Sequence, residues 1–403
     1  MKAASIIVAV LVLVVVPALV WMLGPGAAWV LEHIDQVTTL QDKDRANALA
    51  AIRGNVLAVA TGLAALLAVY YTARNADTAR RTFRLTERGH DTDRFSKAVE
   101  QLGSAQAPVR LGGLYALEQL GQNNPALRQT IVDVICAYLR MPYDPPQEED
   151  RHGRVRTAQR AARANIARRA SNSVNRNPHE EQQVRLTAQR ILADHLRWRK
   201  PRRWQRVATA NPLFWQDIDL DLTGATLLNI DLNECRINQA MFGRAIFYNG
   251  PWFGDATFNA RAWFAGATFT GGAADVGAFA RATFKDDAVF QGATFGSLAQ
   301  FHGATFARGA WFAGTTFNNA TFTEATFDGE AEFGGAIFMG DARFSKAIFT
   351  GAARFRHVDR GSLDLSEARV TDPDGNHAWP PGWRLDPLAK EAVLRRDVPE
   401  QQP

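Results

Sequence analysis

The strongest constraint on this chain is a short repeat that spaces phenylalanine regularly through its second half. The sequence has 24 Phe, and all but Phe83, Phe95 and Phe214 lie between residues 242 and 355. Most of their steps alternate between five and six residues, and a small residue, usually Ala, stands two positions before nearly every one. Upstream, a strict five-residue step links Leu222, Leu227, Leu232, Ile237 and Phe242. Internal repetition of this kind decides the fold and has to be interpreted first.

An eleven-residue double unit can also mark a right-handed coiled coil. On a helix, however, steps of five and six residues place successive Phe about 140° apart, on two different faces. The segment 242–355 also contains 17 Gly, and each Gly in a helix interior costs roughly 1 kcal/mol. Short extended segments fit better, because residues i−2 and i then point to one side while i−1 points away. Stacked turns of such segments form a β-solenoid with about 4.8 Å between levels.

These residues resemble the pentapeptide-repeat family, whose unit has a small residue, a central Leu or Phe and two variable residues. The run Asp-Leu-Thr-Gly-Ala-Thr-Leu at 221–227 matches this unit well. The resemblance implies a right-handed quadrilateral β-helix, which we expect over residues 217–370. Its expected core includes Phe295, Phe301, Phe306, Phe312, Phe317 and Phe322. Two features depart from the family pattern: the extra residue in alternate units implies a bulge or widened corner, and the run Thr270–Val276 contains no Phe.

Two apolar runs precede the repeats, at residues 3–23 and 55–73. About 20 apolar residues span a bilayer, so the sequence predicts a two-helix transmembrane hairpin with an extracytoplasmic loop at 24–54. A cleaved signal peptide is the alternative for the first run. Arginines cluster just after the second run, from Arg74 to Arg88, and positive-inside bias therefore places both termini in the cytoplasm.

A basic helical region is predicted at residues 74–210, and it carries a second resemblance. The segments 94–104, 109–118 and 184–192 are similar to segments found upstream of the repeats in actinobacterial membrane-anchored pentapeptide-repeat proteins. That resemblance implies a bacterial cell membrane and no established activity. Residues 74–206 hold 26 basic and 14 acidic side chains, a net charge of +12. On one predicted helix, His195 continues an apolar stripe, where a hydrogen-bonded core residue is a better interpretation than a metal ligand.

An Arg-rich insertion occupies residues 151–179 without one acidic side chain. Its arginines are Arg151, Arg154, Arg156, Arg160, Arg163, Arg168, Arg169 and Arg176. A solvated, partly disordered insertion is one interpretation. Contact with anionic lipid is another, because each basic residue gains roughly 1 kcal/mol near such a surface. Nucleic acid is the weakest partner, since no aromatic side chains are interleaved for base stacking.

The sequence carries no signature of catalysis, cofactor binding or metal binding that we could find. Cys136 and Cys235 are expected to be small core residues, and residues 371–403 to form a C-terminal cap and disordered tail. Trp252, Trp263 and Trp311 occupy outward i−1 positions. Counted at four units per coil, they are predicted not to share a face.

We therefore expect a membrane-anchored, non-enzymatic scaffold that presents a rigid β-helix to an unidentified cytoplasmic protein partner. One alternative is a DNA-mimic protein that occupies a type II topoisomerase, as some soluble members of the fold do. That role requires a strongly acidic rod, whereas residues 242–355 hold 8 basic and 9 acidic side chains, a net charge of −1. An uncharacterised enzyme is the second alternative, although the sequence offers no candidate pocket.

Overall fold

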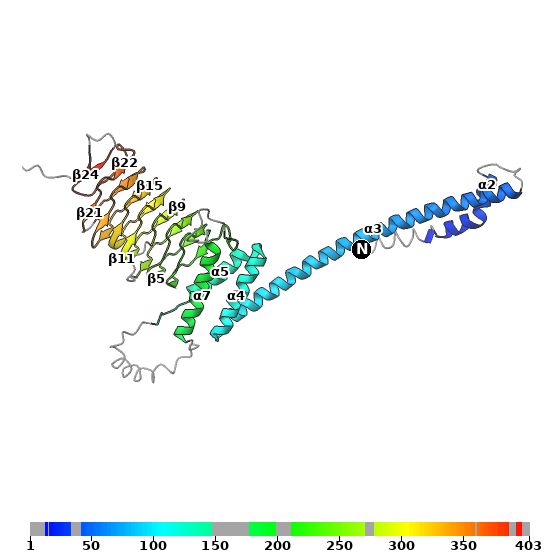
Figure 1. The fold of residues 1–403 in the computed structure, drawn as a ribbon, viewed down its shortest axis with the longest axis horizontal. Coiled ribbons are helices and arrows are strands. Elements are labelled where there is room, and N and C mark those ends of the chain that lie inside the picture. The colour runs from blue at the N-terminus through cyan, green and yellow to red at the C-terminus, as the bar shows by residue number, and fades with distance from the viewer. Residues whose placement is uncertain are drawn as a thin grey trace, which may run out of the picture. The chain divides into compact units, whose positions relative to one another are not determined.

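The structure is a computed structural model that describes residues 13–14, 16–33, 42–146, 177–198, 211–270, 278–358, 361–386 and 392–396. The chain divides into two compact units, Met1–His90 and Asp91–Pro403. The long helix α3 (Asp42–Leu102) contributes to both. Figure 1 shows this helix, the shorter helices and the stacked strands.

The first unit consists of apolar helices. Helical residues 16–21 lead into the π-helix η1 (Met22–Gly26) and the helix α2 (Ala27–His33), with a non-helical backbone at Gly24 just before Pro25. A proline inside a helix removes a backbone donor and clashes with the preceding turn, which accounts for the irregularity. Residues 27–33 and 42–54, predicted to lie in a loop, are helical.

The N-terminal helical segment lies against α3. The two segments line a shared apolar cavity of about 390 Å³, formed by Val14, Ala18, Leu19, Met22, Asn55, Val56 and Val59. An ion pair joins Glu32 to Arg45 between α2 and the start of α3. These contacts hold the two segments of this unit together.

One helical stretch in the described part of the chain, Lys43–Ala76 in α3, is long and apolar enough to cross a membrane. It has 34 residues, a mean hydropathy of 1.9 and none of its most apolar window buried. Val16–Val30 is a shorter apolar helix, and residues 3–12 of the predicted first span lie outside the described residues. The two-span hairpin is therefore not confirmed.

The second unit begins with a layer of helices. After the last turns of α3 come α4 (Ala107–Asn123), the 3-10 turn η2 (Pro125–Leu127), α5 (Arg128–Arg140) and α7 (Pro178–Leu196). Asn124 and Asn177 each precede a proline, and each side-chain oxygen accepts a hydrogen bond from the backbone N–H two residues ahead. Asn followed by Pro is a strong helix-start signal, because the amide satisfies a donor that the first turn leaves free.

The repeats form three parallel sheets, and the segment after them adds one small antiparallel sheet. The first sheet contains β1 (Leu220–Asp221), β4 (Ala240–Met241), β7 (Ala262–Trp263), β10 (Ala288–Val289), β13 (Ala310–Trp311), β16 (Ala331–Glu332) and β20 (Ala353–Arg354). The second contains β2 (Thr226–Leu228), β5 (Ile246–Tyr248), β8 (Thr268–Phe269), β11 (Thr294–Gln300), β14 (Thr316–Thr321), β18 (Ala342–Arg343) and β21 (Leu363–Asp364), with β17 (Ile337–Phe338) also beside β14. The third contains β3 (Arg236–Ile237), β6 (Thr257–Phe258), β9 (Thr283–Phe284), β12 (Thr305–Phe306), β15 (Thr326–Phe327), β19 (Ile348–Phe349) and β22 (Arg369–Val370). The antiparallel pair is β23 (Trp383–Leu385) and β24 (Leu394–Arg396).

Strand pairing shows that the predicted β-solenoid is correct. Seven strands stack in the first sheet, so about six turns of chain connect them. Like positions pair from turn to turn, as when Phe306 aligns with Phe284 below and Phe327 above. The Phe rings form columns inside: Phe312 stacks on Phe290 at 5.0 Å and on Phe333 at 4.9 Å. All six Phe predicted for the core are buried, and so is the Ala column beside them.

The alternation of five- and six-residue steps reflects two kinds of corner. Most five-residue steps, such as Phe290 to Phe295, turn through a residue with positive φ two positions after the first Phe, here Gly292 at 63°. Six-residue steps, such as Phe295 to Phe301, place their extra residue at the other two corners. At the next level the equivalent step, Phe317 to Phe322, has only five residues, and the register shifts between Phe295 and Leu298. The predicted bulge is present at this corner.

Both ends of the solenoid are covered within the second unit. At the first turn, the Gln129 side-chain amide donates a hydrogen bond to the Asp219 carbonyl and accepts one from the Asp219 N–H. The Gln189 amide makes the same pair of bonds with the backbone of Leu228. At the last turn, the Trp379 ring contacts the Phe349 and Phe355 rings at 5.6 and 6.1 Å. In Figure 1, α4, α5 and α7 lie at the end of the solenoid opposite β22 and β24.

Candidate functional site

Outward-facing residues of the solenoid form straight columns, because the register pairs the same repeat position at every level. In the first sheet the outward column reads Asp221, Met241, Trp263, Val289, Trp311, Glu332 and Arg354. Its four middle members, Met241, Trp263, Val289 and Trp311, are all apolar; three of them are partly exposed, whereas Val289 is buried. We call these four residues the indole column.

Trp252, Trp263 and Trp311 were predicted not to share a face, and two of the three, Trp263 and Trp311, lie in the indole column. No Phe divides the ten residues from Phe269 to Phe279. In the structure they replace a single six-residue step, since Phe269 pairs with Phe247 and the Phe253 N–H bonds the carbonyl of Ala278. Trp263 and Trp311 are therefore two full turns apart in one column, while Trp252 pairs with Asp231 on another side.

Each of the two indole rings packs closely against a glycine. A Cβ atom added at Gly243 would lie 3.1 Å from Cδ1 and Nε1 of Trp263, and one added at Gly309 would overlap the Trp311 ring. Both Trp side chains are half-buried. Each indole therefore rests against a glycine with one part covered and another facing outward.

Ion pairs lie at both ends of the indole column and along one of its sides. Arg140 pairs with Asp221 at one end, and Arg354 pairs with Glu330 and Glu332 at the other. Along one side, Arg261 approaches Asp287 at 3.8 Å and Arg308 approaches Asp286 at 3.9 Å. Four levels at about 4.8 Å give the apolar strip a length of about 14 Å.

The neighbouring sheets present mostly hydroxyl groups at the same outward position. The second sheet carries Thr226, Ile246, Thr268, Thr294, Thr316 and Ile337. The third carries Arg236, Thr257, Thr283, Thr305, Thr326, Ile348 and Arg369. Aromatic side chains thus share an outward column only in the first sheet among the described strands, which makes that face the candidate interaction surface.

The helical layer contains a buried charged cluster that the sequence reasoning missed. Glu181 pairs with Arg110 at 3.1 Å and with Arg185 at 2.9 Å, and the Tyr138 hydroxyl donates to Glu181 at 2.8 Å. Burial, together with this bond, raises the pKa of Tyr138 to about 12. The cluster ties α4, α5 and α7 together. Helical spacing signals only one of its members, since Arg110 falls on the buried stripe of α4 with Ala107, Leu114 and Leu117.

His195 is a core residue in the structure. Its Nδ1 lies 2.7 Å from the Leu213 carbonyl, its Nε2 lies 3.0 Å from Glu118, and its ring stacks on Trp215. Among the described residues, no three His, Cys, Asp or Glu side chains are placed to hold a metal ion. Cys136 and Cys235 are buried free thiols, and burial raises the pKa of both.

The predicted lipid-contact arginines cannot be placed. Residues 147–176, which include all eight of them, lie outside the described residues. Lipid contact by this Arg-rich insertion stays a prediction.

Stacked parallel turns with inward Phe and Ala define a repeat protein of the β-solenoid class. The family described as pentapeptide repeats (9 copies) matches residues 279–326 and 312–359. Residues 279–359 therefore match the pentapeptide-repeat family, as the sequence resemblance indicated. No curated protein and no solved structure matches the chain.

Proposed function

We propose that the protein is a non-enzymatic, membrane-anchored interaction module whose solenoid binds a cytoplasmic protein partner through the indole column. The observation that carries this proposal is the indole column, in which Met241, Trp263 and Trp311 are partly exposed and Val289 is buried in register between the two indoles. Indole side chains supply large contact area with little loss of conformational freedom, and Trp is enriched among the residues that dominate protein interfaces.

Anchoring through α3 is the second part of the proposal. Large apolar side chains of α3 are exposed to solvent, among them Leu57 at 58%, Leu66 at 68% and Val69 at 67%. A helix that is apolar on all sides requires either a protein core or lipid around it. The two-span topology with both termini in the cytoplasm is part of this proposal, supported by the Arg cluster that follows residue 73.

The DNA-mimic alternative is less well supported by the surface chemistry. A mimic of DNA needs repeated acidic groups along the rod. Here several outward carboxylates lie beside cations: Asp255 bonds Arg281 through both oxygens, and Glu330 pairs with Arg354. The solenoid presents paired charges and an apolar strip, which favours a protein partner.

The decisive experiment compares two double variants of the full chain in its native host. Trp263→Ser with Trp311→Ser removes the indoles, whereas Thr268→Ala with Thr316→Ala alters the neighbouring sheet at the same two levels. After crosslinking and purification, we expect the same proteins with the wild type and the Thr variant. The Trp variant should recover them at least about tenfold less efficiently, since each anchor residue of an interface contributes about 2 kcal/mol or more.

Matched folding is the control for this comparison. Both variants should keep the far-UV circular dichroism spectrum and the unfolding midpoint of the wild type within a few degrees. Equal recovery of the same proteins by all three chains would overturn the assignment of the partner surface to the indole column.

A further inference from the structure

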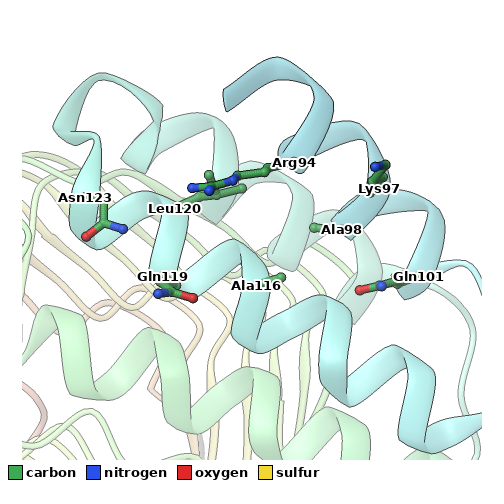
Figure 2. A pocket seen from close by; sticks show the side chains of 8 residues that line it. All are labelled: Arg94, Lys97, Ala98, Gln101, Ala116, Gln119, Leu120 and Asn123. Carbon is green, nitrogen blue, oxygen red and sulfur yellow. The ribbon is translucent and has the colours of Figure 1, made fainter. Parts of the chain in front are cut away.

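The α3–α4 hairpin of the second unit contains a groove that the proposed function does not use. Its volume is about 330 Å³, and Figure 2 shows its lining on the two helices. Arg94, Lys97, Ala98 and Gln101 come from α3, and Ala116, Gln119, Leu120 and Asn123 come from α4. The groove lies entirely within the compact unit that starts at Asp91.

Two contacts between the helices flank this groove. At one end the helices cross tightly, since a Cβ atom added at Gly113 would lie 2.7 Å from the Ala98 carbonyl oxygen and 2.8 Å from the Leu102 nitrogen. At the other end, the Asn124 side-chain amide donates to Asp91 at 3.1 Å. A short trough of this volume suits a compact small molecule, because small-molecule sites occupy roughly 300–1,000 Å³.

The chemistry of the lining points to an anion. Arg94 and Lys97 stand one helical turn apart and face the same groove. No carboxylate lines it: Asp91 is bonded to Asn124, and Glu118 is bonded to His195. Within the described part of the chain, neither Arg94 nor Lys97 makes an ion pair or hydrogen bond. Both side chains are exposed, so their charges are open to a ligand, and the two together attract an anion in the groove.

The other lining residues indicate which kind of anion fits the groove. The floor is apolar, formed by Ala98, Ala116 and Leu120, of which Ala98 and Leu120 are buried. Gln101, Gln119 and Asn123 surround it with carboxamides, which can both donate and accept hydrogen bonds. A guanidinium and an ammonium together match the oxygens of a phosphate group. The apolar floor and the carboxamides fit a neighbouring ring or polyol.

We propose that the α3–α4 groove binds a phosphate-bearing compact ligand, with the phosphate between Arg94 and Lys97. The same chemistry is offered by a free phosphorylated metabolite and by the headgroup of a phospholipid. The experiment below separates these two sources.

The test uses the full chain in neutral detergent and in neutral-lipid nanodiscs. Adenosine monophosphate serves as the soluble probe, with inorganic phosphate as competitor, and binding is measured by calorimetry. Nanodiscs that contain phosphatidic acid provide the lipid arm, in which lipid that copurifies after exchange into detergent is quantified by mass spectrometry. The proposal expects specific binding in at least one arm.

Two variants examine the groove itself. Arg94→Gln with Lys97→Gln should weaken binding by about tenfold or more, because two charge-assisted hydrogen bonds are lost. Ala116→Phe should block binding without changing any charge, because the ring fills the floor. The control is Lys285→Gln with Lys346→Gln, an equal change of net charge on the solenoid, and it should bind as the wild type does.

Each outcome decides the proposal. Loss of soluble-probe binding in both groove variants, but not in the control, supports a metabolite, and the same pattern confined to phosphatidic acid supports a lipid headgroup. Absence of binding in both arms overturns the proposal. Equal weakening in the groove and control variants also overturns it, because the effect would then come from net charge alone. Partner capture by the indole column is a separate measurement and can succeed or fail independently.

Discussion

Substituting tryptophan at two adjacent positions tests the inward and outward assignment of the solenoid directly. Ala304 is fully buried beside Phe306, while Thr305 is half-buried and belongs to an outward column between Thr283 and Thr326. We expect Ala304→Trp to be strongly destabilising and Thr305→Trp to be nearly neutral. Both variants add the same residue type to the same turn, so composition cannot explain a difference between them.

The magnitude at Ala304 follows from how tightly its level is held. The Thr305 N–H bonds the Ala282 carbonyl below, and the Thr326 N–H bonds the Ala304 carbonyl from above, each at 2.9 Å. The adjacent Phe306 ring stacks on Phe284 and on Phe327, each at 5.0 Å. Overpacking a core costs typically 1–3 kcal/mol. Because neither neighbouring turn can move without breaking these bonds, we expect about 3 kcal/mol at Ala304 and within about 0.5 kcal/mol at Thr305.

Urea unfolding followed by far-UV circular dichroism measures both values, since this signal does not depend on the added indole. The free energies of unfolding can be compared if the denaturant slopes agree among the chains. Equal losses at the two positions, or a larger loss at Thr305, would refute the assigned register of the solenoid.

Four further predictions concern other parts of the chain. Glu181→Gln should destabilise the helical layer by about 3 kcal/mol in thermal or chemical unfolding, because it leaves Arg110 and Arg185 buried without their carboxylate; an unchanged midpoint would contradict this. Cys136 and Cys235 should not react with a thiol reagent at pH 8 until the chain unfolds, since burial raises the pKa of Cys136 to about 12. Reporter fusions after Phe95 and within 35–45 should report cytoplasm and exterior, respectively, and the reverse pattern would exclude the proposed topology. A chain from Arg74 onward should sediment with anionic vesicles but not with neutral ones, and replacing the arginines at 151–176 should abolish this.

The core of the solenoid could be predicted from the sequence because its signal is redundant. Nearly every turn repeats the same Ala and Phe, so an error at one position cannot change the inferred register. The outward columns carry no such redundancy. Placing Trp311 above Trp263 requires the length of each corner, including the ten-residue step from Phe269 to Phe279 that replaces a six-residue step.

The helical layer was predictable in its elements and less so in its contacts. Asn124 with Pro125 indicated a helix start, and the structure has one there. The cluster around Glu181 depends on how three helices pack, which local sequence does not specify. The groove beside Arg94 likewise depends on the close crossing at Gly113, since glycine alone permits that approach of two backbones.

The covered ends of the solenoid also determine what the protein can assemble into. A stack of parallel turns has an open edge at each end, where the unpaired backbone groups of the terminal turn can pair with an identical chain. Here helices close the first turn and Trp379 closes the last. A chain truncated before Trp379 would keep one closed end, so two copies could join through their open ends and growth would stop there. Endless filaments would require both closures to be lost, since only a head-to-tail contact can propagate.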